Sequence, residues 1–343
     1  MTSDIRPHAS LRHAAQRRYH TLASWLPYTV AMMFAGAHGA LAQTPPNAGV
    51  PAQTVAAFDT LFSGPHEAAR AVHAKGIVVQ GTFTPAVGAA QLTRAIHVNG
   101  STIPVLARFS NFAPGADGAA GASPRGMAIR FQLPDGGSTD IVAHSYNGFP
   151  AAAPDEFLAF LRALSSPETT AAFAATHPAA RTFLNAPKPV PASYGTETYF
   201  GVSAFRFTNA AGEARFGRYR LQPVAGEAHL AASEAESRDP NFLSQEIASR
   251  LGIGPVRFTL LVQIASNEDA VDNGAVAWPA DRPVVELGTL SLTALEPNND
   301  AAQRELRFVP TNLVGGIAPS SDPMLTARTQ SYRISADRRG ADR

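Results

Sequence analysis

An arginine precedes a tyrosine by four residues near the end of the sequence, at Arg328 and Tyr332. Asp322 and Pro323 predict that a helix begins just before them, since aspartate is a favoured N-cap residue and proline a favoured first helical residue. Residues at i and i+4 lie on one face of a helix, so the guanidinium and the phenol should be neighbours. A nearby cation favours the phenolate over the phenol, whose ordinary pKa is about 10, so Tyr332 has the chemistry of an anionic ligand. Taken alone, such a pair is more often an exposed contact on a surface helix.

Three segments upstream carry histidine, arginine and serine residues of similar interest. In chain order they are RAVHAKG at 70–76, PVLARFS at 104–110 and SPRGMAIRF at 123–131. Together with residues 322–332 they resemble the signature segments of haem catalases, in the same order and at similar spacing. FVPTNLVGGI at 308–317 resembles the stretch that leads into the catalase ligand helix, and the resemblance extends from about Phe58 to Arg339. HAKG alone would be a weak signal, but the ordered set is specific.

The resemblance implies a haem b cofactor whose iron is bound by Tyr332, the expected metal ligand. It also implies that His73 is the distal residue, which takes a proton from a hydroperoxide and returns it to the leaving oxygen as a general acid and base. Ser110 is expected to orient the ring of His73. A lone histidine beside an apolar stretch is more often a hydrogen-bonded core residue, but the Arg-x-x-His-Ala-Lys-Gly context favours the catalytic interpretation.

Haem carries two propionate groups, and carboxylates that become buried require paired cations. By resemblance, Arg70, Arg108 and Arg328 line the haem, the first two nearer the propionates. Arginine suits this task because its planar group binds a carboxylate through two hydrogen bonds. Apolar walls of the pocket are expected from four side chains that could equally be ordinary core residues: Val72, Phe149, Phe157 and Phe160.

One segment, DIVAHSYNGF at 140–149, departs from the catalase pattern. Where catalases carry an asparagine that helps to bind peroxide, the corresponding residue is His144, and Asn147 lies three residues further on. Histidine is larger than asparagine and, with an ordinary pKa of about 6.5, is able to carry a charge near neutral pH. The sequence also stops soon after Tyr332, without the wrapping and C-terminal helical regions of full-length catalases. Both departures are typical of the small catalase-related peroxidases, and His144 is kept as a third candidate catalytic residue beside His73 and Ser110.

The resemblance therefore implies an enzyme that reduces organic hydroperoxides and hydrogen peroxide with a small organic electron donor, and that has weak catalase activity. Two alternatives stay open: a lipid hydroperoxide isomerase on the same fold, and a non-catalytic haem-binding protein. Small-molecule peroxides and organic electron donors are the expected partners, and a homodimer is left open as the assembly.

The composition narrows the chemistry further. The sequence has no cysteine, which excludes disulfide bonds, thiol peroxidases, thiolate-ligated haem and covalently attached c-type haem. Of the 28 basic and 27 acidic residues, four and one lie in residues 1–42, so the remainder carries 24 and 26 and a net charge of −2. Nucleic-acid binding, which usually needs a basic patch, is not expected.

The first 42 residues have the parts of a secretory signal peptide: four arginines, an apolar run from Leu22 to Ala42 and a final Ala-Leu-Ala. We expect cleavage near Ala42, a periplasmic location and no stable membrane insertion afterwards; an uncleaved membrane anchor is the alternative. Arg17 and Arg18 leave open a twin-arginine export route. Residues 43–52 are expected to be a linker, and residues 53–343 a single haem-binding barrel domain.

Short segments rich in β-branched and aromatic residues alternate with Gly, Pro, Asn and Asp turns, which is the pattern of strands. Eight such strands are expected, at 76–84, 104–109, 127–133, 139–143, 197–207, 214–223, 257–264 and 284–292. Helices are expected at 155–164, 167–176, 242–251 and 323–332. With the resemblance, these elements predict an α+β, mainly β fold: an eight-stranded antiparallel catalase-like β-barrel with peripheral helices, whose haem pocket lies between the barrel and the C-terminal ligand helix.

Overall fold

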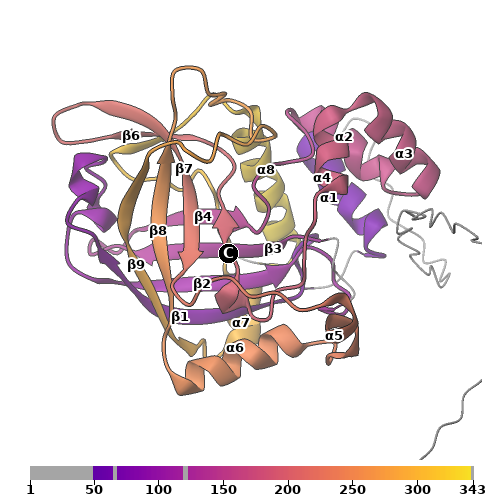
Figure 1. Ribbon diagram of the computed structural model, residues 1–343, viewed down its shortest axis with the longest axis horizontal. Helices are drawn as coiled ribbons and strands as arrows, with labels where there is room; N and C mark the ends of the chain where they lie inside the picture. Colours follow the sequence, from indigo (N-terminus) through magenta and orange to yellow (C-terminus); the bar gives the residue numbers. More distant parts are fainter. Residues whose placement is uncertain (1–48, 65–67, 119–122, 341–343) are drawn as a thin grey trace, which may run out of the picture. The chain divides into compact units, whose positions relative to one another are not determined.

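The computed structural model describes residues 49–64, 68–118 and 123–340 (Figure 1). The signal peptide expected over residues 1–42, its cleavage site and most of the expected linker lie outside the described residues. Within those described ranges, no helix combines the length and the apolar character that a membrane span requires.

The described strands form one antiparallel sheet that closes on itself (Figure 1). The strands are β1 Gly76–Pro85, β2 Ile103–Asn111, β3 Arg125–Gln132, β4 Ser138–His144, β5 Tyr199–Phe200, β6 Phe205–Thr208, β7 Ala214–Pro223, β8 Val256–Ile264, β9 Val284–Leu295 and β10 Ile317–Pro319. The strand β7 pairs with β5 on one edge and with β8 on the other, which closes the ring β7-β5-β4-β3-β2-β1-β9-β8. The eight-stranded barrel expected from the sequence is confirmed.

One expected strand is divided in the structure. Residues 197–207 were expected to be continuous, but β5 and β6 are separated by residues 201–204 and pair with different parts of β7. In the gap, the carbonyl of Ala204 accepts a hydrogen bond from the backbone N–H of Ser320, at 3.3 Å. The short strand β10, which directly precedes Ser320, pairs with β6. This strand was not expected from the sequence.

The barrel interior is filled by apolar side chains from alternate strand positions. Phe83, Phe109, Phe131 and Phe258 are completely buried there. The rings of Phe83 and Phe131 meet edge to face at 5.2 Å, and that of Phe109 stacks on Tyr194 at 5.3 Å, both favourable aromatic geometries. Because successive side chains of a strand point to opposite faces, the residues on either side of Phe109 belong to the outer face of β2.

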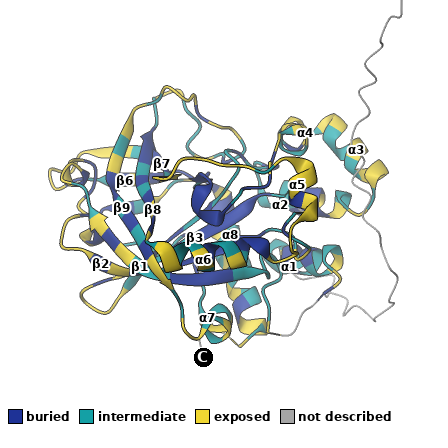
Figure 2. Ribbon diagram, turned by 60° about the horizontal axis from the view of Figure 1, so that its bottom comes forward, coloured by how far each residue is buried: buried dark blue, intermediate teal, exposed yellow. Residues whose placement is uncertain are grey.

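Helices cover part of that outer face. They are α1 Val50–Leu61, α2 Pro154–Ala163, α3 Pro167–Thr176, α4 Pro178–Asn185, α5 Ala232–Ser237, α6 Phe242–Ile253, α7 Asn299–Glu305 and α8 Pro323–Arg338. The first four lie together at one side of the barrel (Figure 1) and share a separate apolar cluster, centred on the buried residues Phe58, Phe160, Leu161 and Ala180. Helices α3 and α5 are largely exposed, whereas the strands that face the core are buried (Figure 2).

Each helix expected from the sequence is confirmed, although α8 continues to Arg338, beyond the expected end near Tyr332. The linker expected at 43–52 is wrong in its last three residues, because α1 begins at Val50. This helix has no side-chain N-cap hydrogen bond and packs on α2 and α8. Its stability therefore comes from tertiary contacts, which short helices usually need.

A buried histidine in the barrel core should make the fold sensitive to acid. His97 is 1% exposed, its ring lies 4.9 Å from that of Phe131, and burial lowers its pKa to about 4. An unfolded chain has a histidine pKa of about 6.5. Between pH 6.5 and 4 the unfolded chain thus binds a proton that the folded chain does not. The stability contributed by neutral His97 is fully present above pH 6.5 and is lost as the pH falls toward 4.

We therefore expect the variant His97→Leu to lose less stability on acidification than the parent protein. The difference in unfolding free energy between pH 7 and pH 4.5 should shrink by on the order of 2 kcal/mol. Urea unfolding at the two pH values measures this difference. The same loss in both proteins would contradict the role assigned to His97.

Candidate functional site

A row of paired residues crosses the outer face of strands β1 to β4. Gly76 pairs with Ser110, Ser110 with Gly126 and Gly126 with His144. Residues that pair directly across an antiparallel ladder point to the same face, so the serine and the second histidine flank Gly126. A Cβ atom at Gly126 would lie 2.8 Å from Cε1 of His73 and 2.8 Å from Oγ of Ser110. Glycine is required there because the ring of His73 lies directly over the row.

Hydrogen bonds hold both the ring and the backbone of His73. Its Nδ1 lies 3.0 Å from Oγ of Ser110, its carbonyl accepts from Nη2 of Arg108 at 2.8 Å, and its N–H donates to the carbonyl of Phe112 at 3.4 Å. Its backbone adopts φ +58°, which histidine tolerates better than most residues. The contact with Ser110 leaves Nε2 as the ring nitrogen that is available for chemistry.

Burial keeps His73 neutral. Desolvation lowers its pKa to about 3, and the positive charge of Arg108 acts in the same direction. An imidazole that stays neutral at physiological pH has a lone pair with which to accept a proton. The structure thus brings together the pair His73 and Ser110 that the sequence predicted, in a geometry suited to general base chemistry.

The lysine of the HAKG segment has a structural role. Nζ of Lys75 lies 2.6 Å from the carboxylate of Asp117, which is fully buried. The same carboxylate accepts hydrogen bonds from Asn111 at 2.7 Å and from the backbone N–H of Leu243 at 2.8 Å. This ion pair joins the start of β1 to the end of β2 and to α6, and so fixes the segment that carries His73.

Three arginines meet near the end of α7. Arg70 donates to the carbonyl oxygens of Gln303 and Leu306, and Arg108 donates to Oε1 of Gln303 at 3.0 Å. Arg339, which sequence reasoning missed, donates to the carbonyl of Leu306 at 2.9 Å. Among the described residues, Arg70 and Arg108 donate hydrogen bonds to carbonyl oxygens and not to a carboxylate.

This arginine cluster (Arg70, Arg108 and Arg339) is under electrostatic strain. Burial, with a smaller contribution from the charge of Arg339, lowers the pKa of Arg108 to about 10. Burial also lowers the pKa of Arg70, with added repulsion from Arg108 and Arg339. Arg70 and Arg108, which repel each other and have no carboxylate bonded to them among the described residues, are suited to binding an anionic group. Arg339 lies two helical turns after Tyr332, so its i+7 spacing was the signal that could have found it.

Helix α8 presents the predicted arginine–tyrosine pair to the same region. Asp322 caps its first turn by accepting from the N–H of Met324 at 2.8 Å, as expected. Nη2 of Arg328 donates to the phenol oxygen of Tyr332 at 3.2 Å. An electrostatic interaction with Tyr332 raises the pKa of Arg70, and the charge of Arg328 lowers the pKa of His73. The helix thus faces both the arginine cluster and His73.

His144 is neutral, so the expectation that it could be charged near neutral pH is wrong. Desolvation, followed by the charge of Arg328, lowers its pKa to about 3. Nδ1 accepts a hydrogen bond from the N–H of Tyr146 at 3.4 Å, which leaves the proton on Nε2. This Nε2 is buried and makes no hydrogen bond with the described residues. His144 therefore carries a buried N–H donor with its bonding capacity unused.

The expected apolar residues divide into two groups. Phe160 is 3% exposed and belongs to the core of the helical cluster. Val72 and Phe157 are half-buried and pack against that helical cluster. The ring of Phe149 lies 6.3 Å from the ring of His144 and 4.8 Å from that of Phe157. Of the four, Phe149 has the closest ring contact with a candidate catalytic residue.

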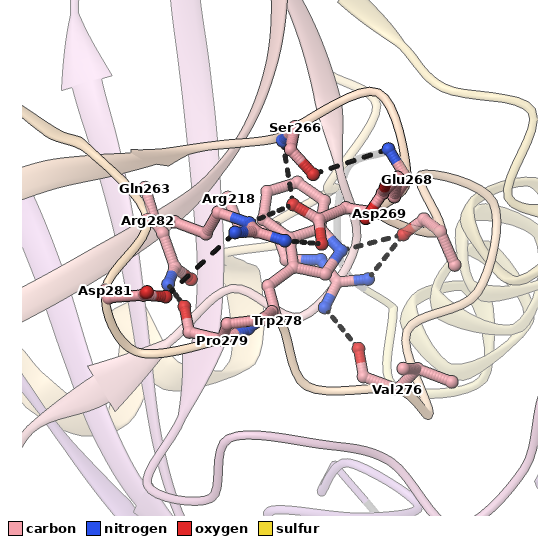
Figure 3. Close-up of polar contacts among 11 residues, drawn as sticks. Arg218, Gln263, Ser266, Glu268, Asp269, Val276, Trp278, Pro279, Asp281 and Arg282 are labelled. Atoms are coloured by element: carbon pink, nitrogen blue, oxygen red, sulfur yellow. Dashed lines mark hydrogen bonds and ion pairs between the residues drawn. The ribbon is translucent and has the colours of Figure 1, made fainter.

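A small pocket lies beside Arg328 at the edge of this site. It is lined by Phe149, Val202, Ser203, Gly274, Asp322, Met324 and Arg328. Gly274 belongs to the loop 265–283. The buried Arg218 holds this loop by donating to the carbonyl of Val276 (Figure 3) and to the carbonyls of Ala270 and Asn273. The guanidinium of Arg218 also stacks on Trp278 at 4.2 Å, so this wall of the pocket is firmly positioned.

The family model described as Catalase matches residues 52–342. Two proteins described as catalase-related peroxidases are similar in sequence. The first, from Mycolicibacterium paratuberculosis, is 40% identical over 291 residues, which cover 82% of this chain and 92% of that protein. The second, from Synechococcus elongatus, is 33% identical over 302 residues, which cover 84% of this chain and 88% of that protein.

Solved structures of larger proteins share the fold. A fungal catalase superimposes with a TM-score of 0.71 and 23% identity, covering 82% of this chain and 61% of its own. A bacterial catalase gives a TM-score of 0.70 and the same identity, covering 60% of its own chain. At that identity the likeness shows the barrel architecture alone.

Proposed function

The chain belongs to the catalase family, and from this membership we propose that it is a haem-dependent peroxidase, which reduces hydroperoxides with electrons from a small organic donor. One observation supports the proposal most directly. A neutral histidine held by Ser110 and an Arg328–Tyr332 pair on α8 lie within electrostatic reach of each other. Neither the His73–Ser110 pair nor the Arg328–Tyr332 pair is evidently needed to hold the other in place.

The residues present fit haem b. The propionates require cations, and the arginine cluster supplies buried guanidinium groups with no carboxylate bonded to Arg70 or Arg108 among the described residues. The iron requires a ligand, and the phenol oxygen of Tyr332 has a guanidinium 3.2 Å away that stabilises its anionic form. When bound, the haem supplies the iron at which the O–O bond is broken and the electrons of the donor are received.

The protein side chains supply the proton chemistry. Nε2 of His73 takes the proton from the hydroperoxide and gives it to the oxygen that leaves as an alcohol, while Ser110 holds the ring through Nδ1. Overall, one hydroperoxide, two electrons from the donor and two protons give one alcohol and one water. The unused N–H of His144 would donate a hydrogen bond to a peroxide oxygen, in the role of the asparagine of catalases.

The substitution of histidine for asparagine also bears on the reaction type. Dismutation requires a second hydrogen peroxide molecule to enter the same small space and deliver its hydrogens. The imidazole of His144 is larger than an amide and takes up part of that space, so reduction by an organic donor should predominate. The reason is steric, since burial keeps the ring uncharged.

We expect the purified protein, loaded with haem b, to oxidise a dye readily with an organic hydroperoxide and to release little oxygen from hydrogen peroxide. Absorption spectroscopy with a dye donor and an oxygen electrode measure the two activities.

The variant His144→Asn should release oxygen about tenfold faster, because one such steric change is worth about that factor. Vigorous oxygen release by the parent protein would indicate a true catalase. Consumption of hydroperoxide in the absence of a donor would favour the isomerase. A haem spectrum with no peroxide turnover would favour the non-catalytic haem-binding protein.

A further inference from the structure

Lysine is rare in this chain: of its 28 basic residues, only Lys75 and Lys188 are lysines. Lys75 forms the ion pair with Asp117 described above. Lys188 lies between two prolines directly after α4, and it is 8% exposed. Lysine is almost never this deeply buried unless it is paired. Among the described residues, however, its ammonium contacts carbonyl oxygens and aromatic rings, so an ion pair does not explain its position.

The ammonium of Lys188 completes the C-terminal end of α4. The carbonyl of Phe183 would accept a helical hydrogen bond from the residue four positions later, but that residue is Pro187, which has no N–H. Nζ of Lys188 donates to this carbonyl and to that of Ala186, the latter at 3.1 Å. Pro189 also restricts Lys188 to an extended backbone. A cation at this end of a helix is further favoured by the helix dipole.

The same ammonium holds an aromatic ring from another part of the chain. Nζ of Lys188 lies 4.3 Å from the ring centroid of Phe183 and 5.2 Å from that of Tyr146, in the turn after β4. The two rings meet edge to face at 5.1 Å. A cation over an aromatic ring is stabilising, and more so where water is excluded. We call Lys188, Phe183 and Tyr146 the lysine clamp, because its charge joins α4 to the turn after β4.

Tyr146 connects the lysine clamp to His144. Its N–H donates to Nδ1 of His144 at 3.4 Å, which is the contact that leaves the ring proton on Nε2. Its carbonyl accepts from the N–H of Gly148 at 3.1 Å, within the same turn. A displacement of Tyr146 would therefore change both the tautomer of His144 and the direction in which its N–H points.

The charge of Lys188 changes within an accessible pH range. Burial lowers its pKa to about 8, so the ammonium is present below that pH and is lost above it. Burial raises the pKa of the Tyr146 phenol and lowers that of His144 to about 3, so both are neutral where the lysine titrates. Charged side chains of α2 and α4 have other partners: Glu156 binds the N–H of Ala152, Arg162 the side chain of Gln53 and Arg181 the carbonyls of Ala174 and Ala175.

We propose that Lys188 is a positioning residue for His144, which acts through the ring of Tyr146 and directs the Nε2–H donor of His144 toward the hydroperoxide. This proposal rests on the proposed peroxidase function. The charged form of Lys188 is the one that positions His144, so the reaction is weakened at alkaline pH. Lys188 lies outside the segments that resemble catalases, and its role follows only from the contact between α4 and the turn after β4.

A double-mutant cycle tests whether Lys188 acts through His144. With hydrogen peroxide and one dye donor at pH 7, Lys188→Met should lower kcat/KM about two- to fivefold, the value of one cation–π contact. In the His144→Ala variant the same change should have no further effect, because the residue that is positioned is absent. The control is Arg181→Met, which removes an exposed charge from the same helix and should react as the parent protein does.

A second pair of variants tests the lysine clamp without altering the end of α4, and applies if Lys188→Met fails to fold. Tyr146→Leu removes the ring but leaves the hydrogen bonds of Lys188 to the carbonyls of Phe183 and Ala186. It should lower kcat/KM by a similar factor. Tyr146→Phe keeps the ring and should react as the parent protein does.

The pH profile separates positioning from a merely structural role. The parent kcat/KM should fall by the same factor between pH 7 and 9.5, with a midpoint near pH 8. Lys188→Arg remains charged over this range and should not show that fall. Lys188→Met should be slow at both pH values.

Two measurements do not depend on turnover. Carbon-13 NMR of protein labelled at the ε-carbon of lysine should give one signal for each of the two lysines. The signal that is lost in Lys188→Arg should titrate with a midpoint near pH 8. Hydrogen exchange of the peptide 144–149, followed by mass spectrometry at pH 7, should be faster in Lys188→Met than in the parent protein. If the parent protein shows no peroxide turnover, the proposed function fails, and these measurements test the lysine clamp separately.

Three outcomes would overturn the proposal. The first is an equal effect of Lys188→Met with and without His144, which would show that Lys188 only stabilises the fold. The second is a parallel pH profile in the parent protein and Lys188→Arg. The third is unchanged hydrogen exchange in Lys188→Met. In each case a normal reaction of the parent protein with hydrogen peroxide would leave the proposed function intact.

Discussion

Replacement of His73 by alanine should slow the reaction of the haem-loaded protein with hydroperoxide by about 100- to 10,000-fold, the usual contribution of a general acid–base group. The reason is that Nε2 of His73 is the ring nitrogen left available by the hydrogen bond to Ser110. Stopped-flow absorption after mixing with hydroperoxide measures the rate. Because burial lowers the pKa of His73 to about 3, the parent rate should not fall as the pH decreases from 8 to 5.

The control for this prediction concerns the backbone. His73 adopts φ +58°, which alanine tolerates poorly and asparagine well. His73→Asn should therefore keep the fold and the haem content while showing the same slow reaction. A decrease of less than tenfold in both variants would contradict the catalytic role. Loss of folding in both would favour a structural role for this histidine.

Replacement of Tyr332 by phenylalanine should weaken haem binding by more than about 100-fold and change the ferric absorption spectrum. The variant retains the ring but lacks the oxygen to which Arg328 donates at 3.2 Å. Arg328→Gln should have a milder effect, about 10- to 100-fold, because residues that orient a metal ligand usually contribute that much. Haem titration of the apoprotein measures both affinities.

Tyr146→Phe is a matched control for this substitution. Tyr146 is a half-buried tyrosine in the turn after β4, whose ring meets that of Phe183 at 5.1 Å. Its variant should bind haem as the parent protein does. If Tyr332→Phe binds haem with an unaltered spectrum, Tyr332 is not the ligand.

The sequence predicted those parts of the fold that depend on local pattern. Alternating apolar residues such as Phe83, Phe109 and Phe131 located the barrel strands, and Asp322 with Pro323 located the start of α8. Parts that depend on tertiary packing were missed or misplaced. Helix α1 has no capping side chain and is held by α2 and α8, while β10 exists only because β6 is beside it.

The candidate site shows the same division. Motif order pointed to His73, Ser110 and Tyr332, but the register that places Gly126 under the ring of His73 requires the paired strands. The charge of His144 could not be judged from sequence, since its pKa follows from burial.

The packing of α1 on α8 has a consequence for the biosynthesis of the protein. Oγ of Ser331 donates to the carbonyl of Pro51, 280 positions earlier, and Arg338 pairs with Asp59 at 2.8 Å. Helix α1 is thus without its α8 contacts while the ribosome adds the residues between them. At about 5–20 residues per second, this interval is on the order of 15 to 60 seconds. Helix α8 also carries Tyr332, so this wall of the candidate site forms only after α8 has been synthesised and has packed on α1.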